Sequence, residues 1–494
     1  MSDSGGQVLQ WGLDAAALYQ LLVSRDQRFD GRLWFGVTST GIYCRPVCPA
    51  QKPRQENVRY FAVPAAAVSA GFRACKRCRP DSAPGSRHWD HRQDLTGRAL
   101  RLIGDGLVDD SGVAGLAAAL HVSERHLHRT LVADVGVGPL ALAQSRRAQT
   151  ARLLLEQTEL PVSEIAFASG FSSLRQFNDV IKREFGGAPS TLRTSAVPHM
   201  KAADPRLVLR LKFRPPYDRD LVGQFLAARA IPGVEAHLGG PHGWTHSRTV
   251  RLSSGVSEIN VGITDDHVVV RANNDIRDTG QLVRVIRRWL DLDADVETIN
   301  NVLSRDARLA ALVSRHPGMR VPTTVDPWET LLRAIVGQQV SVAGATTVLG
   351  RLVGRANGSQ PEGLSAFPTA AQVAALEVGD IAACGMPGTR AQTIATLAQQ
   401  VTDGELDLRD TEVNTICQQL RRIRGIGPWT VDYFRMRGLA DPDAFPETDL
   451  VLKQNAQRVG LDPGPRALLD RASGWRPWRA YAAHHLWNLP KESI

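Results

Sequence analysis

The chain contains only six cysteines among 494 residues, and no apolar stretch is long enough to span a membrane. The first residues, MSDSGGQ, lack the pattern of a secretory signal peptide. Cys384 and Cys417 show no pairing pattern, so a secreted scaffold held by disulfide bonds is not expected. We therefore expect a reducing cytoplasm and no membrane partner.

The other four cysteines form two tight pairs, which are Cys44 and Cys48 in GIYCRPVC and Cys75 and Cys78 in FRACKRC. The pattern is C-x3-C, a gap of 26 residues and then C-x2-C. Zinc prefers four tetrahedral thiolates, and such short spacings let each pair bind from one turn. The spacing therefore predicts one Zn²⁺ site. A purely structural zinc and a zinc-activated, reactive thiolate both remain open at this point.

Positive charge is concentrated near these cysteines. The net charge is +9, and residues 51–100 carry 10 Lys/Arg against 4 Asp/Glu. Arg73, Lys76, Arg77 and Arg79 surround the second pair. Such a cluster attracts phosphate, so it favours a nucleic-acid partner.

Length predicts about three or four domains. Residues 1–88 hold the cysteine pairs, 92–195 an internal repeat, 205–317 alternating strand and helix patterns, and 318–494 a helical pattern. Breaks near 80–90 and 197–204 separate the first three. We therefore predict a multidomain α+β protein in which a small zinc module and an all-α domain precede an α+β domain and a second all-α domain.

The repeat in 92–195 has an offset of 50 residues. Its matched positions are Leu127 and Phe177, Leu131 and Ile181, Gly136 and Gly186, and Pro139 and Pro189. Each unit reads as a short helix, a tight turn (with Gly170 in the second unit) and a helix capped by Ser123 or Ser172. This pattern predicts a double helix-turn-helix.

Polar positions on the second helix of each unit favour DNA contact over a plain helical bundle, because such side chains reach base edges and phosphates. These positions are Arg125, His126, Arg129, Arg175, Gln176, Asn178, Lys182 and Arg183.

The segment LRRIRGIGPWTVDYFRMRG predicts a helix-hairpin-helix, with Gly425 and Gly427 in the hairpin and Pro428 opening the second helix. Glycines allow close backbone approach to a ligand, and the N–H groups at a helix start face an anion. The hairpin is therefore expected to grip phosphate without reading sequence. The alternative is an ordinary helical corner.

Asp449, in FPETDLVLKQ, lies 22 residues after Gly427. As a helix N-cap, alone or with Thr448, it would be structural. At the mouth of an aromatic cleft it would stabilise an oxocarbenium ion and position water, as in glycosidic cleavage. Trp429, Tyr433 and Trp478 are candidates to line that cleft and stack on an extruded base, although core packing is the alternative for each ring.

These motifs carry a family resemblance along nearly the whole chain. The front half, with GIYCRPVC, ENVRYF and AGFRACKRCRPD, resembles the zinc domain of the bacterial Ada family, followed by an AraC-type double helix-turn-helix. The back half resembles AlkA, the DNA-3-methyladenine glycosylase II family. It matches in FRPPYD, GQFLAARA, VGQQVSVAGA, RGIGPWTVDYFRMRG, TDLVLKQ and RPWRAYAAHHLW.

The resemblance implies roles for individual residues. Cys44 matches the zinc-bound thiolate that accepts a methyl group from a DNA methylphosphotriester, and Thr40 and Arg73 match DNA-contacting positions. Asp449 matches the catalytic aspartate. The positions that match the aromatic base pocket are Phe225, Trp429, Tyr433 and Trp478. A monovalent cation at the hairpin, a role in the nucleoid, RNA polymerase as partner and a monomeric state are further expectations.

Several positions depart from the family pattern. Pro49 and Gln51 replace basic residues, Leu450 replaces a tyrosine, and Gln339 occupies the position of the leucine that wedges into DNA. Trp429 stands where strand-cutting relatives carry a lysine, so no amine is placed for a Schiff base. The four cysteines of an iron–sulfur cluster and the PCHR motif of the second Ada methyltransferase domain are missing.

The sequence therefore predicts a DNA repair enzyme and regulator with two chemistries. One is stoichiometric methyl transfer to Cys44, and the other is monofunctional release of alkylated bases such as 3-methyladenine, with both alkylated and promoter DNA as partners. One alternative is a transcription regulator whose glycosylase half only binds DNA. Another is an enzyme whose helix-turn-helix units only improve the search for damage.

Overall fold

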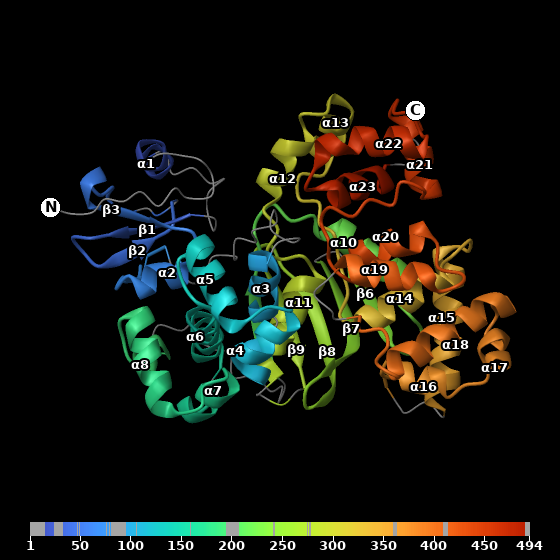
Figure 1. The fold of residues 1–494 in the computed structure, drawn as a ribbon, viewed down its shortest axis with the longest axis horizontal. Coiled ribbons are helices and arrows are strands. Elements are labelled where there is room, and N and C mark those ends of the chain that lie inside the picture. Colours follow the sequence, from blue (N-terminus) through green and yellow to red (C-terminus); the bar gives the residue numbers. More distant parts are fainter. Residues whose placement is uncertain are drawn as a thin grey trace. The chain divides into compact units, whose positions relative to one another are not determined.

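A computed structural model of the chain divides into two compact units, Met1–Pro205 with Asp275–Arg284, and Arg206–Asn274 with Val285–Ile494. Outside the described residues are 1–14, 24–32, 47, 49, 76, 79, 81–94, 105, 159, 194–206, 241–242, 274, 276–277, 359–362, 409–412 and 490–494. The expected breaks near 80–90 and 197–204 lie almost entirely in these ranges. Figure 1 shows the elements of each unit along the chain.

The cysteine module is a small four-stranded sheet with two helices. Its strand order is β3-β1-β2-β4, in which β2 and β4 are parallel and the other pairs are antiparallel. Gly36 in the central strand is required by packing, because a Cβ there would lie 2.7 Å from the ring of Phe72. The elements are α1 (Ala15–Val23), β1 (Trp34–Val37), β2 (Ile42–Cys44), β3 (Val58–Phe61), α2 (Pro64–Ser69) and β4 (Arg73–Ala74).

Helices alone form the next part of the first unit. They are α3 (Leu95–Gly104), α4 (Leu107–Ala119), α5 (Glu124–Val135), α6 (Pro139–Gln157), α7 (Val162–Ala168), α8 (Leu174–Phe185) and α9 (Pro189–Arg193). The 50-residue repeat corresponds to α4–α5 and α7–α8, and Gly136 and Gly186 end α5 and α8 in the left-handed conformation. The helix-turn-helix prediction is therefore confirmed at the level of fold.

One predicted cap is wrong. Ser123 caps α5 by accepting from the His126 N–H, but α8 is capped by Ser173, which accepts from the Gln176 N–H, and not by Ser172. The repeat itself explains the difference, because an offset of 50 residues places Ser123 opposite Ser173.

The second unit begins with a five-stranded antiparallel sheet of order β5-β9-β8-β7-β6 (Figure 1). Its strands are β5 (Leu207–Lys212), β6 (Glu235–Gly240), β7 (Gly243–Leu252), β8 (Gly255–Ile263) and β9 (His267–Ala272). Helix α10 (Arg219–Arg229) packs on β6 and β7. Helix α11 (Thr279–Trp289) begins in the segment that belongs to the first unit and ends in the second, and α12 (Val296–Leu303) and α13 (Ala307–Arg315) follow before residue 318.

The rest of this unit is helical and is built around α14 (Pro327–Val336), which contacts α15, α18 and α20. Every residue of α14 except Arg333 is buried. The other helices are α15 (Val342–Asn357), α16 (Ala370–Ala374), α17 (Val378–Ala383), α18 (Gly388–Thr402), α19 (Val413–Arg422), α20 (Pro428–Arg437), α21 (Leu450–Arg458), α22 (Pro465–Ala472) and α23 (Arg479–Trp487). The predicted multidomain fold class is confirmed.

Candidate functional site

The two cysteine pairs meet because β2 and β4 pair in parallel. Cys44 ends β2, and Cys75 directly follows β4 and donates its N–H to the Tyr43 carbonyl at 3.0 Å. The Sγ atoms of Cys44, Cys48, Cys75 and Cys78 all lie within 4.8 Å of one another, and all four residues are buried. Tetrahedral zinc with Zn–S bonds of about 2.3 Å places its sulfurs about 3.8 Å apart, so this cluster fits zinc.

Electrostatics within the cluster also call for a cation. Hydrogen bonding to Cys48 and burial raise the pKa of Cys44, whereas hydrogen bonds from Cys44 and Cys78 lower the pKa of Cys48 to about 2. Protons shared in this way keep neighbouring thiols neutral, because four packed thiolates repel one another. A divalent cation removes that repulsion and allows all four to ionise.

Backbone donors distinguish the sulfurs. The Arg45 N–H donates to Cys78 Sγ at 3.4 Å, and the Ala50 N–H stabilises the Cys48 thiolate. For Cys44, the groups among the described residues that set the pKa are the Cys48 and Cys78 side chains and burial, with no backbone N–H group. An N–H bond withdraws charge from a thiolate, so Cys44 keeps more of its nucleophilicity than these two ligands.

The predicted DNA contacts of this module lie on its surface. Thr40 is exposed in the turn between β1 and β2, and Arg73 and Arg77 are exposed beside Cys75 and Cys78. Lys76, Arg79 and Pro49 lie outside the described residues.

The helix-turn-helix positions are also accessible. Arg125 and Arg129 are exposed on α5, and Arg175 and Lys182 are exposed on α8. Gln176 is half-buried, because it lies in the first turn of α8 beside the capping serine. The buried faces of both helices hold the repeat's apolar positions, so the polar positions are left for a ligand.

The hairpin predicted from GIG joins α19 to α20. Gly425 has a φ of 93°, and a Cβ there would lie 2.3 Å from Thr393 Oγ1, so only glycine fits. Gly427 is exposed and precedes Pro428, the first residue of α20. This is the helix start expected to face phosphate.

Gln339 lies in the loop between α14 and α15, beside this hairpin. Its neighbour Gln338 donates to the Gly425 carbonyl at 3.0 Å and to Thr430 Oγ1 at 2.8 Å, which fixes the loop against the hairpin. Gln339 is exposed and has a φ of 57°. Its side chain therefore projects from a rigid turn.

Asp449 caps α21 and is held by two indoles. Its Oδ1 accepts from the Leu452 N–H at 2.8 Å and from Trp487 Nε1 at 2.9 Å, while its Oδ2 accepts from Trp429 Nε1 at 2.7 Å. Both oxygens are thus oriented by fixed donors, and the carboxylate remains half-buried. Asp449 can act both as the N-cap of α21 and as the carboxylate of the site, because one oxygen caps the helix while both oxygens accept from the aromatic cluster.

Trp487 is the residue of this cluster that the sequence reasoning missed as a site residue. Tyr433 stacks on Trp429, with ring centroids 5.2 Å apart, and lies 6.4 Å from the Trp487 ring. Trp478 is buried, and its ring packs edge-on against Tyr481. The available signal was the position of Trp487 within the matched segment RPWRAYAAHHLW, six residues after Tyr481.

Replacing Trp487 with phenylalanine should lower the rate of base release about tenfold. The change keeps a ring against Tyr433 but removes the N–H that orients Asp449, and a hydrogen bond to a charged group contributes roughly 1.5–3 kcal/mol. Single-turnover rates under saturating enzyme measure the effect. Trp475→Phe is the matched control, because Trp475 Nε1 donates to the distant Asp306 carboxylate at 2.8 Å. Equal losses in both variants would mean that Trp487 only stabilises the fold.

Phe225 on α10 lies among cations. The Cζ atoms of Arg229 and Arg437 are 4.1 and 4.3 Å from its ring centroid. Although burial opposes ionisation of Tyr433, the guanidinium groups of Arg437 and Arg229 outweigh it and lower the pKa of the phenol. A base that stacks on Phe225 must therefore share the ring with these guanidinium groups.

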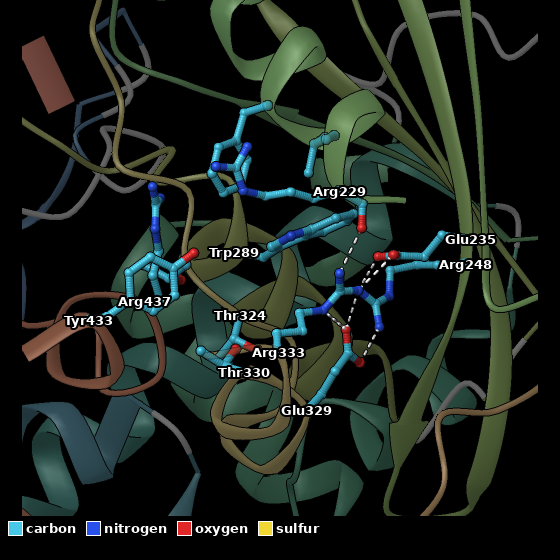
Figure 2. A pocket seen from close by; sticks show the side chains of 13 residues that line it. Arg229, Glu235, Arg248, Trp289, Thr324, Glu329, Thr330, Arg333, Tyr433 and Arg437 are labelled. Carbon is cyan, nitrogen blue, oxygen red and sulfur yellow. Dashed lines mark hydrogen bonds and ion pairs between the residues drawn. The ribbon is translucent and has the colours of Figure 1, made fainter. Parts of the chain in front are cut away.

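A cavity of about 50 Å³ opens beside Phe225 and Tyr433 (Figure 2). Arg333 lies between Glu235 and Glu329, with distances of 2.6 and 2.7 Å, and Arg248 contacts the same two carboxylates at 2.7 and 2.6 Å. Burial raises the pKa of Glu235, but the guanidinium groups of Arg333 and Arg248 lower it by more. The pKa of Glu235 therefore lies well below its usual range. These ion pairs join the sheet to α14 and form one wall of the cavity.

Comparisons with known protein families agree with this architecture. Four family models match, described as the metal binding domain of Ada (residues 17–81), a helix-turn-helix domain (116–195), the AlkA N-terminal domain (208–326) and the HhH-GPD superfamily base excision DNA repair protein (332–478). No helix among the described residues is long and apolar enough to cross a membrane.

Individual relatives cover the whole chain or its second half. A Mycobacterium tuberculosis protein named "Probable bifunctional transcriptional activator/DNA repair enzyme AlkA" is 44% identical over 490 residues, with 97% of each chain covered. "DNA-3-methyladenine glycosylase 2" of Escherichia coli is 32% identical over 284 residues, covering 56% of this chain and 95% of its own. The solved 3-methyladenine DNA-glycosylase of Archaeoglobus fulgidus, 20% identical with a TM-score of 0.50, covers 56% of this chain and 96% of its own and shares the fold. The chain therefore belongs to the family of bifunctional Ada/AlkA proteins, which join an Ada-type zinc-binding domain and a helix-turn-helix domain to an AlkA-type base excision repair domain.

Proposed function

We propose that this protein is a monofunctional DNA glycosylase for alkylated bases and also a methyl acceptor that regulates transcription. One observation carries the glycosylase half. The Asp449 carboxylate is held by Trp487 and by Trp429, which lies in the first turn of α20, directly after the GIG hairpin. A protein that only grips DNA has no use for a carboxylate oriented by two indoles.

The arrangement supports hydrolysis through a sugar cation. The C1′–N bond breaks with its electron pair leaving on the base, and the Asp449 carboxylate stabilises the positive charge that develops on the sugar. Water then adds to C1′ and releases its proton. Three donors already occupy Asp449, so the carboxylate acts as a fixed charge.

Incubation with methylated duplex DNA tests this half. We expect free alkylated base to appear, while the DNA strand stays intact until alkali is added. Trp429 occupies the place where a Schiff-base lysine would stand, so direct nicking is not expected. Nicking by the purified protein would contradict the monofunctional assignment, and DNA binding without base release would favour a regulator whose second half only binds DNA.

For the first half, we assign Cys44 as the methyl acceptor. Its Sγ attacks the methyl carbon of a DNA methylphosphotriester, so that an S–C bond forms, the C–O bond breaks and a phosphodiester anion leaves. Bound zinc would be held by Cys44, Cys48, Cys75 and Cys78 and would keep their thiolates deprotonated at neutral pH. Thr40, Arg73 and Arg77 are exposed, and in this proposal they hold the neighbouring phosphates.

Methylation should raise operator affinity. Four thiolates on Zn²⁺ carry a formal charge of −2, which repels phosphate, and methylation of Cys44 reduces that charge to −1. The positive charges of the exposed Arg73 and Arg77 are then less neutralised. The zinc module therefore adds more to the binding of operator DNA by the helix-turn-helix positions on α5 and α8. Operator Kd at fixed salt, measured before and after exposure to methylphosphotriester DNA, should fall about tenfold for loss of one repulsive charge. Equal affinities would contradict the switch and leave the helix-turn-helix units a role in damage search.

The proposal extends to the remaining expectations. As an activator the protein would contact RNA polymerase, act as a monomer and work in the nucleoid.

A monovalent cation would bind carbonyl groups of the hairpin. The carbonyls of Arg424 and Gly425 each accept one hydrogen bond, from Thr393 and Gln338, which leaves one lone pair on each for a cation. Replacing K⁺ by a larger organic cation should weaken DNA binding if this cation site exists.

A further inference from the structure

The turn between α14 and α15 presents one polar side chain to solvent. Gln339 is exposed, and its φ of 57° lies in the left-handed region that residues other than glycine seldom adopt. Within the described part of the chain, its side-chain amide has no hydrogen-bond partner. A strained backbone of this kind costs stability and persists where the surrounding structure enforces it, often for a function. Gln339 is therefore a candidate for contact with a ligand.

Hydrogen bonds fix this turn against the hairpin. Gln338 donates to the Gly425 carbonyl at 3.0 Å and to Thr430 Oγ1 at 2.8 Å. The Arg390 guanidinium donates to the Gln338 carbonyl at 2.7 Å. These bonds hold the residue directly before Gln339 by its side chain and by its main chain. Gln339 therefore keeps its position relative to the GIG hairpin when the hairpin holds a phosphate.

The same contacts place the turn near the Asp449 carboxylate. Thr430 directly follows Trp429, whose Nε1 donates to Asp449 Oδ2 at 2.7 Å. The first turn of α20 thus contacts both the Gln339 turn and the carboxylate. In the proposed reaction the damaged nucleotide leaves the duplex, and its sugar lies at Asp449. The Gln339 turn then lies at the border of the gap that this nucleotide leaves.

Exposed apolar side chains stand beside the glutamine. Val340 is 44% exposed and Val342 is 42% exposed, and both follow Gln339 within three residues. Apolar side chains that enter a duplex occupy the space between neighbouring base steps. The turn therefore combines an apolar surface, which suits the faces of stacked bases, with one amide that suits a base edge.

We propose that Gln339 enters the gap and binds the base opposite the damaged nucleotide through the Watson–Crick edge of that base. The inference rests on the glycosylase function proposed above and names a DNA contact of the same site. Extrusion leaves the donors and acceptors of the opposite base without partners, and polar groups left unpaired away from water are costly. The glutamine carbonyl accepts from a donor on that edge, and its NH2 group donates to a neighbouring acceptor. The leucine expected at this position from the family resemblance would fill the gap and satisfy neither group.

The test measures the Kd of two duplexes that carry a cationic pyrrolidine abasic analogue at the target position. One has thymine opposite the analogue, and the other has difluorotoluene, an apolar base analogue with the shape of thymine. The target position holds no base, so this exchange breaks no base pair. For the wild type, Kd should rise about tenfold with difluorotoluene, because a two-bond contact to a base edge is lost. For Gln339→Leu the two Kd values should agree within about twofold, because leucine bonds neither base.

The ratio of the two Kd values decides the outcome. An amide that turns over pairs with each natural base, so the test removes the hydrogen-bonding groups and does not exchange one base for another. Gln399→Leu is the matched control, because Gln399 is also exposed and its amide donates to Asp403 at 2.9 Å on α18. This control should keep the ratio of the wild type.

The same ratio in the wild type and in Gln339→Leu would overturn the inference, whatever the absolute affinities. Release of alkylated base by the wild type is measured on the same preparation. If the wild type releases no base, the glycosylase function fails and this inference fails with it. Base release together with a ratio that does not depend on Gln339 removes only this inference.

Discussion

Replacement of Asp449 by asparagine should slow base release about 100-fold or more. The substitution keeps the N-cap of α21, since asparagine caps as well as aspartate, but it removes the negative charge that faces the sugar. Loss of one preorganised electrostatic contact in a transition state costs roughly 3–4 kcal/mol, and each 1.36 kcal/mol is about a factor of ten in rate. Single-turnover release of base from alkylated duplex measures it, and DNA binding through the hairpin should persist.

The hydrogen bonds from Trp429 and Trp487 to Asp449 complicate the interpretation of this variant, and a similar indole–carboxylate bond elsewhere supplies its control. Asparagine has one carbonyl oxygen, so either Trp429 or Trp487 must face its amide group. Asp306→Asn has the same chemistry elsewhere, because Asp306 caps α13 and accepts from Trp475 Nε1. That control should lose stability while keeping base release. A near wild-type rate in Asp449→Asn would show that Asp449 is only a cap.

Replacement of Cys44 by alanine should abolish methyl acceptance completely and leave base release within about twofold of the wild type, because the two sites lie in different compact units. The reactive sulfur is removed, and two of the three remaining ligands, Cys48 and Cys78, accept hydrogen bonds from backbone N–H groups that reduce their nucleophilicity. Transfer of labelled methyl to protein and release of base are measured on the same preparation.

Zinc loss is the main confounding effect of this change. Metal binding supplies folding energy to small modules, so three remaining ligands need not keep the module folded. Zinc content and circular dichroism should therefore accompany the assay. Cys417→Ala is the matched control, because Cys417 is buried in the helical core of the second unit and is not one of the four clustered cysteines, so the change should leave both activities intact. Base release lost in a folded Cys44→Ala protein would mean that the two halves are coupled.

Local signals made the architecture predictable. Cysteine spacing indicated the zinc cluster, the 50-residue offset indicated two helix-turn-helix units, and GIGP indicated the hairpin that joins α19 and α20. In each case nearby residues carry the chemistry, so spacing along the chain translates directly into geometry. The offset even corrects the cap of α8 from Ser172 to Ser173, because the two units repeat in structure as well as in sequence.

Long-range contacts in the base pocket were not predictable in the same way. Nothing near Trp487 in the sequence indicates that its indole reaches Asp449, 38 residues earlier. The meeting of Arg437, His484 and Phe225 joins three separate helices, and their charge and burial depend on how those helices pack. Phe225 was assigned to the base pocket by family resemblance, and residue types alone gave no sign that two guanidinium groups lie beside its ring.

The central claim is that one chain carries two separate repair chemistries. It is tested most directly by incubating the protein with duplex DNA that carries radiolabelled methyl groups on both bases and phosphates, and then measuring how the label divides among free base, protein and DNA. We predict label in free base and in protein for the wild type, in protein with free base formed about 100-fold more slowly for Asp449→Asn, and in free base only for Cys44→Ala. With the wild-type protein in excess over methyl groups, label that stays entirely in the DNA, or that appears in only one of the two other fractions, would contradict the account.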